Sequence, residues 1–296
     1  MSSTNQPRIL MGLLPLVTTA IVYAAQCTLP HRLGTIAQHY SAASLRSVSD
    51  VRRNYQAIRT LCIYRVTFSE HQYRWDMLLV TNPHKPHGSF WFLPHDNENS
   101  AFDTAVYATR KYGGGFLAVM SHDKRYHQGQ DPNRNFSMSR TKVPSCRHQK
   151  AASPIYTRTV FSIIDAFRDR RMPYLALHNN TNGGGVSVLR QSRSVRSFTP
   201  YLLEQIQNGS GLADEDNLVY IASTSSQAPR KKIEMLKSLG MNVKYEIVSP
   251  ANNDCSMSNY VVLGKHSSRY YNIEAQHGHT RVQKQMVDLL MKKIVK

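Results

Sequence analysis

Acidic residues are scarce in this chain of 296 residues, with 19 Asp and Glu against 37 Lys and Arg and a formal net charge of +18. The basic residues are spread along the chain, with clusters at 190–196, 229–232 and 292–296. Any one cluster is typical of a solvated surface. Together they predict attraction to a polyanionic surface such as cell wall, lipid head groups or nucleic acid.

Cysteine is also sparse, and no two cysteines have the C-x-x-C spacing. This absence argues against a thiolate zinc site. The cysteines could form up to two disulfides in three alternative pairings, among which the sequence does not decide. The four cysteines are Cys27, Cys62, Cys146 and Cys255.

Long apolar runs are scarce, and the most apolar one, at 9–25, follows Arg8 and contains no charged residue. A basic residue, an apolar run and small residues ending at Ala24 predict a signal peptide over 1–24. Pro15 interrupts a run that is already short for a membrane span, so we expect no stable span after cleavage, and an uncleaved anchor is the alternative. We therefore expect an exported protein, periplasmic or associated with the cell envelope. Export argues against nucleic acid as the partner.

Internal repeats and low-complexity linkers are absent too, so we expect one main domain over 61–296, preceded by a helical lead-in over 25–60 that includes an amphipathic helix at 41–61. Helical patterns at 153–171, 226–240 and 282–294 alternate with short apolar runs. This alternation predicts an α/β domain with a central, mostly parallel mixed sheet and helices on both faces. The predicted strands are 61–68, 75–81, 89–94, 114–120, 174–178, 218–223, 243–248, 260–264 and 270–275.

Four stretches place polar residues beside these runs. "FLPHDNENSA" (92–101) holds His95 and Glu98, and "DPNRNF" (131–136) follows. "YLALHNN" (174–180) ends a strand with His178, and "YYNIEAQHG" (270–278) puts Glu274 into an apolar run. Taken singly, the first two are typical of turns, and His178 of a strand end. Glu274 is informative even alone, because a carboxylate is costly to bury without a partner.

In this order the four stretches resemble the zinc carboxypeptidase family, the carboxypeptidase A-like metallopeptidases, including their succinylglutamate desuccinylase and aspartoacylase-like relatives. The resemblance runs from about residue 74 to the end, at the level of motifs. It implies one Zn²⁺ held by His95, Glu98 and His178, with a fourth position left for water. It also implies that Glu274 is the general base and that Asp131 orients His95 through its outer ring nitrogen.

The resemblance further implies that Asn133 and Arg134 bind the terminal carboxylate of the substrate, for which the planar guanidinium is well suited. Arg125 is the nearest candidate for the arginine that polarises the scissile carbonyl, although its spacing is short. Asn179 stands where the family commonly has Ser. Other residues have alternative interpretations: Tyr260, Tyr270 and Tyr271 as a substrate-covering tyrosine or as core, and His277 and His279 as residues of the site mouth or surface.

These implications predict a zinc-dependent exported metallocarboxypeptidase acting on peptides with a free C-terminal carboxylate, such as peptidoglycan stem peptides. An N-acyl amino acid deacylase of the desuccinylase or aspartoacylase type is the first alternative. A non-catalytic module that binds cell wall on the same scaffold is the second.

Overall fold

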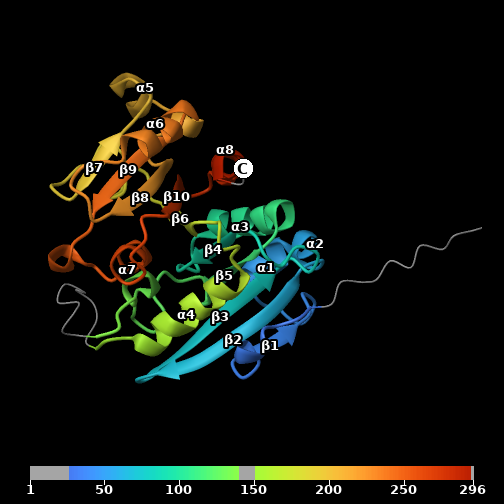
Figure 1. Cartoon of the computed structure of the whole chain (residues 1–296). Helices are drawn as coiled ribbons and strands as arrows, with labels where there is room; N and C mark the ends of the chain where they lie inside the picture. Colours follow the sequence, from blue (N-terminus) through green and yellow to red (C-terminus); the bar gives the residue numbers. More distant parts are fainter. Residues whose placement is uncertain (1–26, 140–150, 295–296) are drawn as a thin grey trace, which may run out of the picture.

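The computed structural model describes residues 27–139 and 151–294 (Figure 1). The predicted signal peptide, 1–24, lies outside these residues. Within them, no helix is both long and apolar enough to cross a membrane.

A mixed sheet of ten strands forms the centre of the molecule, in the order β1-β2-β3-β5-β4-β6-β10-β8-β9-β7. Parallel pairing joins β5, β4, β6 and β10 in the middle, whereas β1, β2, β3 and β7 pair antiparallel with their neighbours. The predicted α/β architecture is confirmed. The strands are β1 (Ala37–Tyr40), β2 (Cys62–Glu70), β3 (Tyr73–Thr81), β4 (Phe90–Leu93), β5 (Gly115–Val119), β6 (Tyr174–Asn180), β7 (Val195–Phe198), β8 (Leu218–Ser223), β9 (Asn242–Ile247) and β10 (Tyr270–Gln276).

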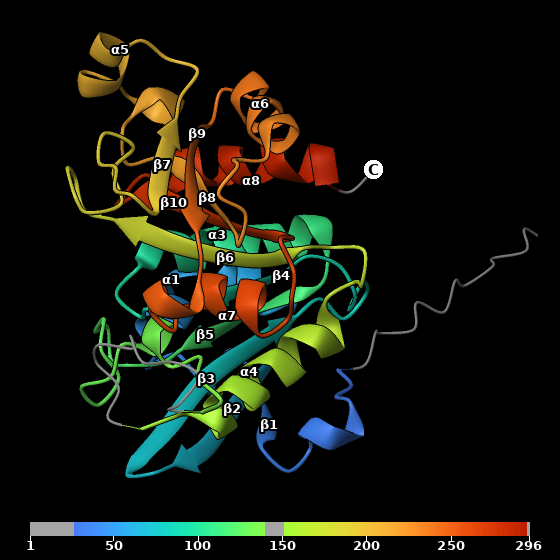
Figure 2. The same ribbon diagram turned by 60° about the vertical axis from the view of Figure 1, so that its left-hand side comes forward.

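Helices cover both faces of this sheet, and Figure 2 shows α4 and α7 in front of it and α3 and α8 behind it. We call these sides the α4 face and the α3 face. Each face has its own cluster of buried apolar side chains. On the α4 face lie α4 (Pro154–Phe167) and α7 (Met257–Leu263); on the α3 face lie α1 (Ser49–Arg53), α2 (Tyr55–Ile58), α3 (Asn99–Tyr112), α6 (Arg230–Ser238) and α8 (Thr280–Ile294), and a short α5 (Leu203–Gln207) lies apart.

The strand predicted at 260–264 is wrong, because these residues fall at the end of α7 and beyond it. The β-branched run resembles a strand, but the hydroxyl of Ser256 accepts a hydrogen bond from the backbone N–H of Asn259 and begins a helix instead. The edge strands β1 and β7 were not predicted. Both are half exposed and lack the apolar run that marks a buried strand.

The single helix predicted at 41–61 is also wrong, since only α1 and α2 form there. Ser44 and Ser41 bond to each other and to the local backbone, which competes with helix formation. The lead-in also contributes β1, which pairs with β2. A disulfide joins Cys27 to Cys62 at the start of β2. Cys255 is disulfide-bonded as well, and Cys146 lies outside the described residues.

Candidate metal centre

Two neighbouring parallel strands deliver the histidines to one edge of the sheet. In the pairing of β4 with β6, Phe92 lies opposite Ala176. His95 follows shortly after the end of β4, and His178 lies two residues beyond Ala176 in β6. Glu98 sits at the start of α3, directly after the turn that carries His95. Residues separated by some eighty positions in the chain are thereby brought together.

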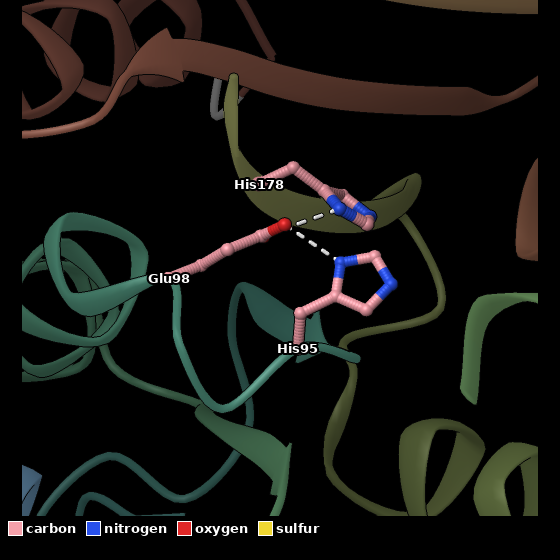
Figure 3. A group of neighbouring side chains, drawn as sticks. All are labelled: His95, Glu98 and His178. Carbon is pink, nitrogen blue, oxygen red and sulfur yellow. Dashed lines mark hydrogen bonds and ion pairs between the residues drawn. The ribbon is translucent and has the colours of Figure 1, made fainter. Parts of the chain in front are cut away.

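The three side chains point at one another in a buried group (Figure 3). Nδ1 of His95 lies 2.7 Å from Oε1 of Glu98, and Nδ1 of His178 lies 3.3 Å from Oε2. One ligand atom from each residue falls within 4.8 Å of the other two. Two imidazole nitrogens and a carboxylate are the donor set of many catalytic zinc sites, which keep a fourth position open. The group can therefore hold a metal ion.

The groups around Glu98 keep its carboxyl ionised, as a metal ligand must be. Burial raises the pKa of its carboxyl, but the charges of His95 and His178 and their hydrogen bonds outweigh burial, so the pKa lies below its ordinary range. The backbone N–H of Asn179 donates to Oε2 at 2.9 Å and adds to this effect. Glu98 is therefore an anion. A metal cation bound here would replace the proton shared by His95 and Glu98.

Asp131 bonds to the outer ring nitrogen of His95, with 2.9 Å between Oδ1 and Nε2. This contact leaves Nδ1 of His95 facing Glu98. Burial raises the pKa of Asp131, but the hydrogen bond and charge of His95, with Arg125 and Arg134, hold it below its ordinary range. By contrast, Nε2 of His178 has no hydrogen-bond partner among the described residues.

Arg125 lies at the rim of this group. Its guanidinium is 3.3 Å from Oε1 of Glu98 and 3.4 Å from Oδ2 of Asp131. The side chain is 41% exposed, so it faces both the buried carboxylates and solvent. Arg125, whose spacing in the sequence is short for the family, therefore lies against both Glu98 and Asp131.

Glu274 lies next to the histidines on the α4 face. In the pairing of β10 with β6 it is directly opposite His178. Burial raises the pKa of its carboxyl, and the charge of His178 lowers it only in part. Nδ2 of Asn272, two residues earlier on the same face, donates to Oε1 at 2.8 Å. A buried carboxylate with a raised pKa has the property of a general base that also returns a proton.

Two amide side chains, Asn179, which the sequence comparison noted only as a departure from the family, and Gln283, which it did not note, hold the backbone around the ligands. Oδ1 of Asn179 accepts the backbone N–H of Ala101 at 3.0 Å, which ties β6 to the first turn of α3. Nε2 of Gln283, in α8, donates to the carbonyl of His178 at 2.8 Å. Gln283 is fully buried. A glutamine in an otherwise apolar helix stripe was the signal that could have revealed it.

The DPNRNF segment forms a short turn between the metal group and α7. Oδ1 of Asp131 accepts the backbone N–H of Asn133, and Oδ1 of Asn133 accepts that of Met257 at 3.1 Å. Arg134 pairs with Asp254 at 3.3 Å, and its side chain is 31% exposed. The guanidinium of Arg134 is thus partly open, whereas the amide oxygen of Asn133 is bonded to α7.

The remaining candidates lie elsewhere. Tyr260 packs on Phe161 with ring centroids 4.7 Å apart, and Tyr270 and Tyr271 belong to the apolar clusters of the two faces. None of the three is an exposed cover for a site. His277 is exposed and His279 half-buried, both just beyond the end of β10.

Comparison with known proteins gives no family model and no curated protein that matches the sequence. The chain is similar in structure to three solved proteins, each described as a "putative metallopeptidase". These come from Shewanella amazonensis SB2B (TM-score 0.46, 11% identity, 87% of this chain and 98% of that one), Shewanella denitrificans OS217 (0.44, 9%, 91% and 98%) and Shewanella baltica OS155 (0.41, 11%, 87% and 97%).

Proposed function

We propose that this chain is a zinc-dependent metallocarboxypeptidase that removes the C-terminal residue of peptides. The observation that carries the proposal is the buried convergence of His95, Glu98 and His178, with Glu274 opposite His178 on the adjacent strand. Two nitrogen ligands, one carboxylate and a nearby base are what hydrolysis by a zinc-activated water requires. Arg134 adds a cation that can bind a terminal carboxylate.

In this reaction Zn²⁺ would polarise the substrate carbonyl and lower the pKa of a water molecule. Glu274 accepts the proton of that water and delivers it to the leaving amine, and Asn272 holds the carboxylate in position for both transfers. Arg125 faces the ligand cluster and offers a cation to the negative charge that develops on the carbonyl oxygen. Arg134 holds the terminal carboxylate in two parallel hydrogen bonds, in exchange for its contact with Asp254.

The substrate we propose is the stem peptide of peptidoglycan, met by an exported protein at the cell envelope. Two features of the sequence support this choice: the signal-like segment at 1–24 and the net charge of +18. A basic protein is attracted to an anionic wall, and this attraction raises the local concentration of enzyme at its substrate.

The test is incubation of the purified, zinc-loaded full chain with muropeptides and with synthetic peptides, followed by mass spectrometry. We expect the loss of one C-terminal residue, and no loss from the same peptides carrying a C-terminal amide, because Arg134 then has no carboxylate to bind. An unchanged set of masses with zinc present would reject the proposal. Release of a carboxylic acid from N-acylated amino acids instead would identify a deacylase.

A further inference from the structure

Three charged or polar side chains on β8 and β9 share the α4 face with Glu274. Asn272 of β10 pairs with Tyr220 of β8, which pairs with Lys244 of β9, and Glu246 follows two residues later. Tyr245, which lies between Lys244 and Glu246, is in the apolar cluster of the α3 face. Because strand side chains alternate, Tyr220, Lys244 and Glu246 are on the same side as Glu274.

Lys244 is a buried cation without a partner in the described part of the chain. It is 3% exposed, and no described residue gives its ammonium group a hydrogen bond or an ion pair. Burial lowers its pKa to about 8, while the charge of Glu274 acts in the opposite direction. Nζ of Lys244 is not among the fully enclosed polar atoms that lack a partner, so the ammonium group still borders open space. A cation in this position can receive an anion that the described residues do not supply.

Glu246, two residues further along β9, is an acidic residue without a cationic partner among the described residues. Its carboxylate accepts hydrogen bonds from the hydroxyl of Ser258 at 3.0 Å and from Nδ2 of Asn259 at 2.8 Å, both in α7. No described cation lies within ion-pair distance of it. Burial, followed by the charge of Asp254, raises its pKa to about 7. Nearby, Oδ1 of Asn272 is buried and has no hydrogen-bond partner in the described residues, so two acceptors on this face lack a cationic donor there.

A half-buried lysine elsewhere, Lys232, shows that such lysines can find partners within the chain. Lys232 of α6 also has its pKa lowered to about 8 by burial. Its ammonium nevertheless donates to the carbonyls of Ser268 at 2.9 Å and Tyr270 at 3.4 Å, and lies 4.0 Å above the ring of Tyr271. Lys244 has no such contact with a described residue, and unlike Lys232 it lies on the same face of the sheet as Glu274.

We infer that Lys244 and Glu246 select the terminal residue of the substrate, and that the side chain of this residue ends in both a carboxylate and an ammonium group. The inference rests on the proposed function and names its substrate class: peptides ending in a diamino dicarboxylic acid. Residues two apart in a strand are about 7 Å apart, which one amino-acid centre can bridge when each of its groups makes a hydrogen bond of about 3 Å. A lysine side chain would leave Lys244 without an anion. A purely acidic side chain would leave Glu246 without a cation and Oδ1 of Asn272 without a donor.

Three matched ligands test this inference: N-acetyl-alanyl dipeptides ending in 2,6-diaminopimelate, in lysine, which lacks the distal carboxylate, and in 2-aminopimelate, which lacks the distal ammonium. Binding is measured by calorimetry on the full chain, and cleavage as kcat/KM on the zinc-loaded chain. We expect the first dipeptide to bind about 10- to 100-fold more tightly than either of the others, the usual value of one hydrogen bond to a charged group. Equal binding of all three would overturn the inference.

The variants Lys244→Met and Glu246→Gln assign the two groups. Lys244→Met should abolish the preference for diaminopimelate over lysine, and Glu246→Gln the preference over 2-aminopimelate. Lys232→Met is the matched control and should leave both preferences unchanged. If the control removes them equally, the effect is structural and the inference fails. A clear binding preference without cleavage would uphold the recognition and reject the proposed reaction, so the two failures are distinguishable.

Discussion

The two faces of the sheet differ most along β9 and β10, where alternate residues of one strand have opposite character. Tyr271 and Ile273 of β10 pack in the cluster of the α3 face, whereas Asn272 and Glu274 lie on the α4 face. All four are buried, so burial alone does not separate them. The α3 face therefore contributes apolar packing along these strands, while this part of the α4 face buries polar and charged groups, which costs free energy unless they have partners.

The largest effect should come from Glu274→Gln on the α4 face. Loss of a general base costs about 10²- to 10⁴-fold in rate, and the amide keeps the shape of the side chain. We expect kcat on a cleaved peptide to fall by this factor while the metal content, measured by plasma mass spectrometry, is unchanged. Glu234→Gln, at an exposed position of α6, is the control. Full activity of the Glu274→Gln variant would show that the α4 face does not carry the general base.

His178→Ala should reduce metal affinity by more than about 100-fold, which is the upper limit for loss of an outer partner of a ligand. The measurement is a competition with a chelator of known affinity, followed by metal analysis. His277→Ala, exposed beyond the end of β10, should bind metal as the unchanged chain does. Equal affinities of the two variants would show that His178 is not a ligand.

Ile273→Ala tests the α3 face on the same strand. The side chain is fully buried in the apolar cluster, so truncation should lower the free energy of unfolding by about 2–5 kcal/mol. Denaturant unfolding measures this loss. We expect Lys244→Met to cost much less, since an apolar side chain replaces an unpaired buried charge. If the Lys244→Met variant were the less stable of the two, the division between the faces would be wrong.

The smallest effect concerns Asp50, a charged residue of α1 on the α3 face. Burial raises its pKa to about 7, although the neighbouring Arg53 lowers it. An unfolded chain has an Asp pKa of about 3.9, so the native state binds more protons between these values and stability falls as the pH rises through this window. Asp50→Asn should remove part of this fall, as urea unfolding at pH values of about 4.5 and about 8 would show. If the stability of the variant and of the unchanged chain depended on pH in the same way, the raised pKa of Asp50 would be contradicted.

The sequence predicted the candidate metal ligands better than the residues that hold them in place. His95, Glu98 and His178 have recognisable spacing and strand-end positions, and the fold places them together. The roles of Asn179 and Gln283 depend on partners far away in the chain, which no local pattern reveals. The α/β class followed from alternating apolar runs, whereas α7 did not, because a β-branched run has the same composition in a short helix as in a strand.

The alternation of Lys and Glu in β9 was visible in the sequence but had no interpretation there. A strand with charged residues at every second position is typical of one face in solvent. The low exposure of Lys244 shows that this face is covered there, and the register with β8 and β10 shows that it is the face of Glu274. The distinction between a solvated and an enclosed charge depends on neighbouring strands, and therefore on the whole sheet.

The bond from Gln283 to the carbonyl of His178 ties the position of a metal-ligand candidate to a helix on the opposite face of the sheet. Gln283 is fully buried, so local opening of α8 would break this bond together with the apolar packing around it. Such an opening would release the backbone of His178 on one side without any change in the ligand residues themselves. The order of the metal group is therefore coupled to the local stability of α8.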